Sequence, residues 1–295
     1  MTDAFKNAVI QYLKPFEGNF NYETMLSGHL DICRFHSWAD EVSQYKEVTG
    51  SVVLSSGCGS AGDLFVFMEA GATKAYGIEV SDGLADLARK RFLGTRFEDF
   101  VQIDVYDGSV LPYNNDSFDI ILSMHVIEHT QNPTLYLTEL FRVLRPGGVI
   151  FLDVPNRYYK MEQHTLLPYI HFLPMKPRDA FTEVLLSRPF SYLLSGQTKY
   201  KLETLVSFHF PSASQLVRIY STYQATYSLK LEDAFYHSYA GERVPYKAYF
   251  GKYLLGRARK MTTFRMVIRE LRNVLFDAED SKSHEPAKNP HPLRI

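Results

Sequence analysis

Residues 51–63 read Ser-Val-Val-Leu-Ser-Ser-Gly-Cys-Gly-Ser-Ala-Gly-Asp, an apolar run that breaks into a glycine-rich turn. Twenty-two positions after Gly57, a second short apolar run ends in Glu79. A buried strand that feeds a Gly-x-Gly loop lets the backbone approach a ligand closely, and the helix that follows offers free N–H groups to polar or anionic groups. An acidic side chain at the tip of the next strand is placed to accept hydrogen bonds from a ribose diol. This pairing predicts an adenosine-containing cofactor.

The composition is that of a globular protein. Of the 295 residues, 45% are hydrophobic and 22% are charged, a balance that allows a full buried core. The net charge of -1 gives no general attraction to nucleic acid. Cys33 and Cys58 form neither a metal-binding spacing nor a disulfide framework. The N-terminus does not read as a signal peptide, and no stretch reaches the roughly 18 apolar residues of a membrane span. We therefore expect a cytoplasmic protein.

After residue 50, strands alternate with helices, which is the pattern of a parallel α/β sheet. We predict strands near 51–55, 74–79, 99–105, 118–123 and 148–154, and helices near 61–70, 82–93 and 132–144. The predicted parts are an N-terminal helical cap (1–50), a core (51–155 and 208–233), a helical lid insertion (156–207), a C-terminal extension (234–277) and a disordered tail (278–295). The fold expected from this order is a doubly wound, Rossmann-like α/β sheet.

The C-terminal extension is strongly basic. Between residues 243 and 275 there are nine Lys and Arg residues and one acid, Glu270. Over 260–276 the apolar and basic residues fall on opposite faces at helical spacing, which predicts a basic amphipathic helix. Such a helix is commonly one that packs on the protein; it also suits an anionic membrane surface or a phosphate-bearing acceptor. RNA is a less favoured partner, because no RNA-binding motif is present.

The order of the motifs between residues 107 and 148 distinguishes among adenosine cofactors. Asp107-Gly108 follows the third strand, the fourth strand ends in Ser123-Met124-His125, Glu128-His129 comes next, and Arg145-Pro146-Gly147-Gly148 closes the series. In this order the chain resembles the class I S-adenosylmethionine-dependent methyltransferases, especially the group of the ubiquinone-biosynthesis O-methyltransferases. The resemblance covers about residues 45–155 and, more weakly, 208–232.

The resemblance implies a role for several residues in binding S-adenosylmethionine and its product S-adenosylhomocysteine. Gly57 and Gly59 would lie at the methionine end of the cofactor, and Glu79 would bind the ribose hydroxyls. Asp107 and Gly108 would meet the adenine ring, although Asp before Gly is also ordinary turn chemistry. Ser123 and Met124 would line the side of the methyl donor.

Two positions depart from the family pattern. The family usually has an acidic residue where this chain has Ser55, and glycine where it has Ala61. Loss of the acid removes an anchor for the ammonium group of the methionine. Either the cofactor binds more weakly or Asp63 takes over the role.

Three histidines are candidates for the base that a hydroxyl acceptor requires. His129 and His125 follow the fourth strand, and His164 lies in the insertion where this fold builds its acceptor lid. In the ubiquinone-type relatives a Glu-x-x-Glu-His stretch is associated with a divalent metal. Here His125 replaces the first carboxylate, so a metal stays open but is not favoured, and Glu128-His129 could equally cap the loop.

We therefore predict methyl transfer from S-adenosylmethionine to a hydroxyl oxygen of a small molecule or a glycan, for instance in polysaccharide modification. The acceptor could be lipid- or phosphate-linked, which would place the protein at the membrane periphery. A non-catalytic S-adenosylmethionine-binding scaffold is the first alternative, because of Ser55 and Ala61. An RNA methyltransferase that uses the basic helix is the second, and a nicotinamide oxidoreductase is a distant third. The sequence does not indicate an oligomeric state.

Overall fold

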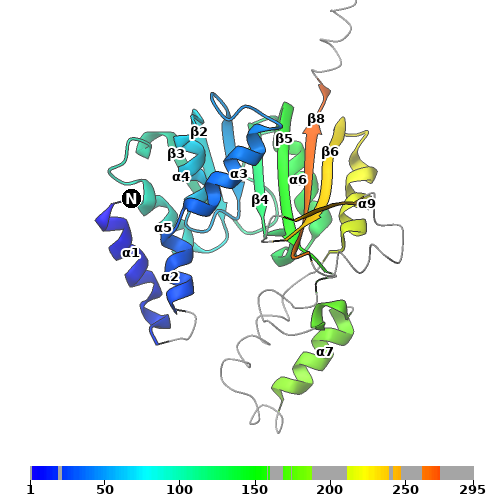
Figure 1. Ribbon diagram of the computed structural model, residues 1–295, viewed down its shortest axis with the longest axis horizontal. Coiled ribbons are helices and arrows are strands. Elements are labelled where there is room, and N and C mark those ends of the chain that lie inside the picture. The colour runs from blue at the N-terminus through cyan, green and yellow to red at the C-terminus, as the bar shows by residue number, and fades with distance from the viewer. Residues whose placement is uncertain are drawn as a thin grey trace, which may run out of the picture.

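The computed structural model describes residues 2–18, 22–157, 159, 169–173, 175–187, 211–238, 242–246 and 261–272. Within these residues the strands form one eight-stranded sheet in the order β3-β2-β1-β4-β5-β8-β6-β7 (Figure 1). The strands are β1 Val52–Ser56, β2 Lys74–Glu79, β3 Val101–Val105, β4 Phe118–Met124, β5 Leu144–Pro155, β6 Leu229–His237, β7 Arg243–Pro245 and β8 Thr263–Glu270. Strands β1 to β5 pair in parallel, and β8 runs antiparallel between β5 and β6. The predicted doubly wound α/β fold is confirmed.

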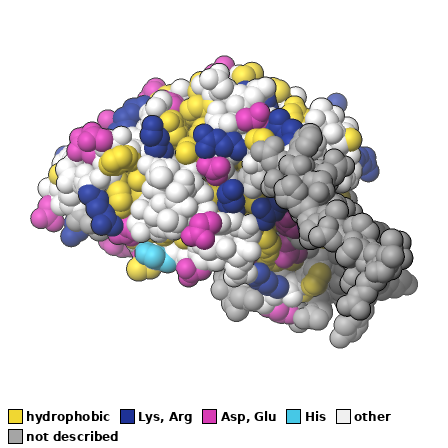
Figure 2. All heavy atoms as spheres, turned by 90° about the horizontal axis from the view of Figure 1, so that it is seen from above, with side chains coloured by type: hydrophobic (Ala, Val, Ile, Leu, Met, Phe, Trp, Pro, Cys, Tyr) yellow, Lys and Arg dark blue, Asp and Glu magenta, His cyan; other side chains and the backbone are white. Residues whose placement is uncertain are grey.

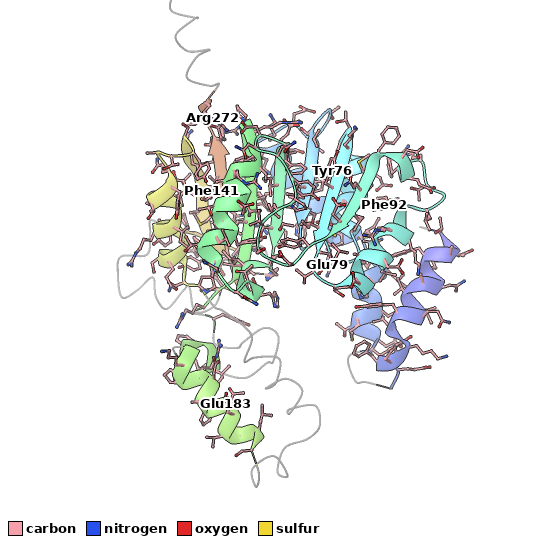
Figure 3. The ribbon with its side chains drawn as sticks, turned by 180° about the vertical axis from the view of Figure 1, so that it is seen from behind. Tyr76, Glu79, Phe92, Phe141, Glu183 and Arg272 are labelled. Atoms are coloured by element: carbon pink, nitrogen blue, oxygen red, sulfur yellow. The ribbon has the colours of Figure 1, made fainter. Side chains whose placement is uncertain are left out.

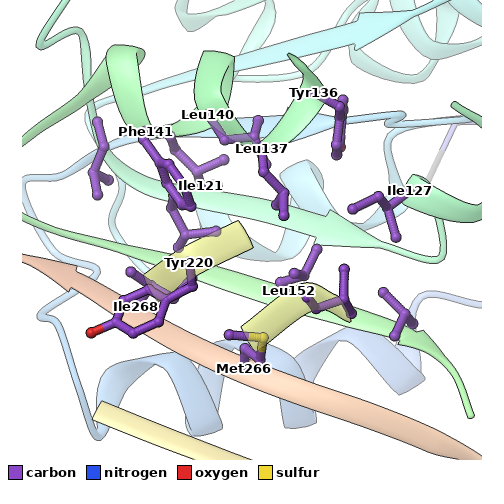
Figure 4. Packing of buried hydrophobic residues seen from close by; sticks show 14 of the residues in the cluster. Ile121, Ile127, Tyr136, Leu137, Leu140, Phe141, Leu152, Tyr220, Met266 and Ile268 are labelled. Carbon is purple, nitrogen blue, oxygen red and sulfur yellow. The ribbon is translucent and has the colours of Figure 1, made fainter. Parts of the chain in front are cut away.

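Helices cover both faces of this sheet (Figure 1). The α-helices of the described residues are α1 Asp3–Leu13, α2 Tyr22–Leu30, α3 Cys33–Ser43, α4 Gly62–Glu69, α5 Asp82–Phe92, α6 Pro133–Val143, α7 Met175–Leu186 and α9 Ala213–Tyr223. Of these, α7 lies apart from both faces of the sheet. Alternate residues of each central strand pack on opposite sides: Val53 joins the core under α3, α4 and α5, and Leu54 joins the core under α6 and α9. Figure 4 shows the second core, where Phe141 of α6 lies near Ile121 and Ile268 of the sheet.

The N-terminal helices extend the first of these two layers. Phe5, Val9 and Leu13 of α1 are fully buried and pack with Leu87 of α5. Phe35 of α3 lies in the same core cluster as Phe67 of α4. Because α2 joins these two helices, the chain before the first strand is tied to the sheet close to the glycine-rich turn.

The predicted helix over 260–276 is wrong. Residues 263–270 form strand β8, which is inserted between β5 and β6 and is buried along almost its whole length. The apolar residues of Thr-Phe-Arg-Met-Val-Ile-Arg-Glu fit a helical stripe, but they also fit a strand that is covered on both faces. The extension predicted at 234–277 is therefore part of the sheet, since β6 continues to His237 and β7 and β8 follow.

The cations of this segment do not form the predicted basic face. Arg265 pairs with Glu41 and Asp153, Arg269 with Glu232, and Arg272 with Asp116 and Glu270. Arg243 pairs with Glu41. The other five Lys and Arg residues of 243–275 lie outside the described residues. On the side of the molecule seen in Figure 2, basic and acidic side chains are intermixed. No single-signed surface is built from the described part of this segment.

The predicted lid is described only in part. Helix α7 and the short turn Ile170–Phe172 belong to it, and the rest of 156–207 lies outside the described residues, as does the predicted tail at 278–295. Figures 1 and 3 show α7 beyond the edge of the sheet at which the parallel strands end. This is the edge where a parallel α/β sheet binds its ligands.

Candidate functional site

The glycine-rich turn after β1 needs a residue without a side chain. Gly57 has a φ of 71°, in the left-handed region. A Cβ atom placed on it would lie 2.6 Å from Cγ2 of Val126, which follows β4. Its N–H donates to the carbonyl of Ile78 on the neighbouring strand (2.8 Å). The turn is therefore held between β2 and the β4 loop, and its backbone faces the ligand edge.

Glu79 stands at the end of β2 and holds this turn (Figure 3). Its carboxylate accepts hydrogen bonds from the N–H groups of Gly59 (3.0 Å), Val80 (2.9 Å) and Ser81 (3.2 Å). The residue is only 7% exposed, so the carboxylate is fixed in place. One acidic side chain thus connects the first glycine-rich turn with the tip of the second strand.

A cavity of about 470 Å³ brings six of the predicted residues together. They come from four turns at the same edge of the sheet: Gly57, Glu79, Asp107, Gly108, His125 and His129. The cavity is also lined by Tyr106 and Tyr136, which the sequence did not single out. Asp107 in addition performs the turn role considered above, because its carboxylate accepts from the N–H (2.9 Å) and hydroxyl (2.5 Å) of Ser109.

A second cavity of about 350 Å³ adjoins the first at Gly57. It is lined by Ser55, Gly59 and Met124 of the predicted region, and by Asp63 at the start of α4. Helices α2 and α3 contribute further side chains, among them His29 and Arg34. Gly57 lines both cavities, so the two lie next to each other at the ends of β1, β2 and β4.

The structure accounts for one of the two departures from the family pattern. Ala61 has a φ of 55° and is fully buried just before α4. Alanine can adopt this left-handed conformation, but it does so at a cost of about 1–2 kcal/mol relative to glycine. Position 61 thus has a backbone conformation that favours glycine.

Ser123 does not line either cavity. It is fully buried, and its hydroxyl pairs with the phenol of Tyr136 (2.7 Å), which in turn donates to Ser56 (2.9 Å). Burial raises the pKa of Tyr136, so the phenol stays protonated. The cavity surface at this point is formed by Tyr136 of α6, and Ser123 supports it from behind.

His125 follows β4 in a left-handed conformation (φ 58°) and lies between two carboxylates. Its Nδ1 is 3.7 Å from Oε1 of Glu128, and its Nε2 is 3.8 Å from Oδ2 of Asp153. Burial acts to lower the pKa of His125, but the two carboxylates outweigh it, so the pKa is raised. The protonated form of this imidazole is therefore stabilised at the cavity edge.

Asp153 is held from the opposite side by two further groups. It is 3% exposed, and its oxygens contact Nη2 of Arg265 (3.0 Å) and Nε2 of His237 (3.1 Å). Burial alone would raise the pKa of Asp153; the charge of Arg265 and the contacts with His237 and His125 bring it down to about 2. Asp153 is thus a permanent negative charge behind His125. No local motif in the sequence points to this group.

Glu128 is the second carboxylate beside His125, and it is fully buried. Among the described residues, neither of its carboxylate oxygens has a hydrogen-bond partner. His129 is more exposed than His125, and its Nε2 is 4.0 Å from Oε1 of Glu128. Glu128 therefore lies close to both imidazoles.

Two remaining candidates concern the lid and a metal. His164 lies outside the described residues. In the described part of the chain, no group of three or more His, Cys, Asp or Glu side chains is arranged to hold a metal ion.

Comparisons with known proteins agree with this geometry. A family model described as a methyltransferase domain matches residues 54–152. Residues 54–152 form a class I S-adenosylmethionine-dependent methyltransferase domain. The cofactor of this domain is S-adenosylmethionine, as the sequence resemblance implied.

Two relatives and one solved structure show how far the similarity extends. A probable S-adenosylmethionine-dependent methyltransferase of Mycolicibacterium smegmatis is 35% identical over 101 residues, which are 30% of this chain and 38% of that protein. A ubiquinone biosynthesis O-methyltransferase of Aromatoleum aromaticum is 26% identical over 174 residues, 52% of this chain and 72% of that protein. The structure of a putative sarcosine dimethylglycine methyltransferase from Galdieria sulphuraria has a TM-score of 0.55 at 14% identity and covers 91% of this chain and 99% of that one. This last likeness concerns the fold alone.

Proposed function

We propose that the chain transfers a methyl group from S-adenosylmethionine to a hydroxyl oxygen of a small molecule or glycan. The observation that carries the proposal is the pair of cavities that meet at Gly57. The larger one, with Glu79 and Asp107, offers carboxylates to a ribose and an adenine, and the smaller one continues along the glycine-rich turn. Such a divided site matches a ligand with a nucleoside at one end and an amino acid at the other.

The residues of this site fit S-adenosylmethionine without rearrangement of the turn. Glu79 already holds the backbone of Gly59, and the absence of a side chain at Gly57 leaves the turn open to the ligand. When bound, the cofactor supplies an electrophilic methyl group on a sulfonium. The protein contributes alignment and the exclusion of water, which are worth several kcal/mol in a displacement reaction.

A hydroxyl acceptor also has to lose a proton, and His125 is the residue we assign to this step. Its ring lines the larger cavity and stands 3.7 Å and 3.8 Å from the carboxylates of Glu128 and Asp153. A proton that His125 accepts from the acceptor hydroxyl is stabilised by these two charges, as in other histidine–carboxylate pairs. Glu128 and Asp153 are positioning residues, since neither lines the cavity.

The class of acceptor follows from less direct support. The similarity to a ubiquinone biosynthesis O-methyltransferase supports a hydroxyl acceptor, and the similar proteins also include N-methyltransferases, among them an ajmaline N-methyltransferase of Rauvolfia serpentina. The described cations of 243–275 are all engaged in ion pairs, so they support neither a phosphate-bearing acceptor nor RNA. No helix among the described residues is long and apolar enough to cross a membrane.

Transfer of a labelled methyl group tests this proposal. The protein is incubated with tritium-labelled S-adenosylmethionine and a panel of hydroxylated small molecules and glycans, each with its amine analogue. We expect label in hydroxyl acceptors, and a His125→Asn variant that is slower by about 10²- to 10⁴-fold with a flattened acid limb of the pH profile. Label only in amines contradicts the hydroxyl assignment. A larger loss in His129→Asn than in His125→Asn makes His129 the base.

Binding without any transfer would favour the alternative of a non-catalytic scaffold. Titration with S-adenosylhomocysteine and the labelling assay together separate these two cases. A scaffold binds the cofactor product and labels no acceptor, whereas an enzyme does both.

A further inference from the structure

The base assigned to the acceptor hydroxyl has to be free of its proton before it can take one. His125 faces two buried carboxylates, Glu128 at 3.7 Å and Asp153 at 3.8 Å, and both stabilise its protonated form. A general base works best when its pKa lies near the pH at which the enzyme operates. Two unopposed carboxylates would hold the proton too firmly, so a group that offsets one of them favours proton transfer.

A second imidazole shares one of these two carboxylates. Nε2 of His237, at the end of β6, is 3.1 Å from Oδ1 of Asp153, whereas His125 faces Oδ2. The hydroxyl oxygen of Thr263 lies 2.5 Å from the same Nε2. Asp153 is ionised, with a pKa of about 2, and an ionised carboxylate only accepts hydrogen bonds. Nε2 of His237 therefore carries the hydrogen and donates it to Asp153.

The orientation of Asp153 does not depend on His237. Arg265 lies opposite Asp153 on the neighbouring strand β8 and donates from Nη2 to Oδ2 (3.0 Å). Arg265 is in turn held by Glu41 of α3. His237 thus acts on the charge of Asp153: a hydrogen bond donated to Oδ1 draws negative charge away from Oδ2, and a protonated His237 draws away more.

His237 is more accessible than Arg265, the other group that offsets the charge of Asp153. Their side chains are 17% and 5% exposed. The remaining charged or titratable groups around the two imidazoles are Glu41 of α3, Glu128 and His129 of the turn after β4, and Arg243 of β7. Arg243 and Arg265 both pair with Glu41, so that carboxylate takes up part of their charge. A substitution at His237 therefore changes the charge at Asp153 with less effect on the fold than one at Arg265.

We propose that His237 is a positioning residue for the base: it occupies one oxygen of Asp153, withdraws negative charge from His125 and leaves that imidazole free to accept a proton. His237 lines neither of the two cavities, so it acts only through Asp153. The inference rests on the proposed function, because it takes His125 as the base.

Nuclear magnetic resonance of the histidine side chains tests the inference without an acceptor. The titration of His125 is followed in the full chain and in His237→Leu, His237→Gln and His36→Gln, and its signal is assigned by its loss in His125→Asn. Leucine removes the donor to Asp153, whereas the amide of glutamine keeps one hydrogen bond without a charge. His36 is the matched control, because it is an exposed histidine of α3 that faces a different carboxylate, Glu69, at 3.9 Å.

We expect the midpoint of the His125 titration to move to higher pH in His237→Leu, because Asp153 then acts on His125 with its full charge. The move should be smaller in His237→Gln and absent in His36→Gln. With a hydroxyl acceptor from the labelling assay, the acid limb of the rate profile should move in the same direction. On this limb His237→Leu should be slower by about 3- to 10-fold, with a change of less than about twofold on the alkaline plateau.

Two outcomes overturn the inference. A His125 midpoint that is unchanged or lower in folded His237→Leu means that His237 does not offset Asp153. Equal moves to higher pH in His237→Leu and His36→Gln mean that a general loss of charge, and not the contact with Asp153, is responsible. If His237→Leu does not fold, the same criteria apply to His237→Gln.

Failure of the proposed function gives a different result. If the His125 midpoint moves as expected and the acid limb of the rate profile does not, His237 acts on His125 as inferred and the assignment of His125 as the base fails.

Discussion

The two halves of the ligand edge are held together in different ways. At the ends of β1 and β2, the turn at Gly57 is fixed by backbone hydrogen bonds and by Glu79, which lies 20 residues from its partner Gly59. At the ends of β4 and β5, His125 is held by buried charges from distant parts of the chain. Arg265 contacts Asp153, which is 112 residues away in the sequence, and Glu41, which is 224 residues away. The first half is built from local contacts that a motif can encode. The second half depends on the completed sheet.

The largest effect is expected on the free energy of unfolding when a buried ion pair of the second half is removed. Replacement of Arg265 by Met leaves Asp153 and Glu41 as buried carboxylates with weaker compensation, which costs about 3–5 kcal/mol in the free energy of unfolding. Lys90→Met removes an exposed pair with Asp86 and should cost less than about 1 kcal/mol. Urea unfolding measures both. Equally small losses of stability in both variants would show that the ion pairs of Arg265 do not stabilise this half of the site.

The pH dependence of stability is the second way to test the charged half. The pKa of Asp153 is about 2 in the folded protein, below its ordinary value, because Arg265, His237 and His125 outweigh its burial. The folded state therefore binds fewer protons at this group. Its contribution, about 2 kcal/mol, is complete above about pH 4 and is lost as the pH falls toward 2.

Unfolding free energies measured between pH 5 and 3 report on this contribution. We expect the stability to fall with pH, and the fall to be shallower in Asp153→Asn, which cannot titrate. An identical slope in both proteins would mean that other carboxyl groups govern acid unfolding and that Asp153 is not specially stabilised.

The glycine-rich half is tested by a pair of matched substitutions. Gly57 and Gly94 have nearly the same left-handed backbone, with φ of 71° and 69°, but only Gly57 has a close neighbour, Val126. Gly94→Ala should cost about 1 kcal/mol for the backbone conformation alone. Gly57→Ala should cost about 1–2 kcal/mol more, as overpacking does, and should weaken cofactor binding as well. Equal costs in thermal unfolding would show that the approach of Val126 to the turn is not tight.

The same comparison explains how much could be predicted from the sequence. The strands up to β5, the turn at Gly57 and the acid at Glu79 follow a strand–turn–helix order with short separations, and the predicted sheet is confirmed there. Six predicted residues line one cavity. Their roles in binding or catalysis stay predictions until ligands are tested.

The errors lie where distant segments meet. Arg265 and Arg269 look like one face of a basic helix when their partners are unknown. In the folded chain their partners are Glu41, Asp153 and Glu232, and the strand they belong to is covered on both faces. Tyr136 and Asp153 were missed for a similar reason: neither belongs to a local motif, and only the packing of α6 and β5 brings them to the site.

The central claim is that the edge at Gly57 and Glu79 binds S-adenosylmethionine, and one titration tests it most directly. Calorimetry with S-adenosylhomocysteine, with NADH as the control ligand, compares the unsubstituted protein with Glu79→Gln. We predict micromolar binding of S-adenosylhomocysteine, no binding of NADH, and a loss of at least about tenfold in Glu79→Gln, which removes one charged acceptor. Equal affinity in both proteins, or no binding by the folded protein, would contradict the account.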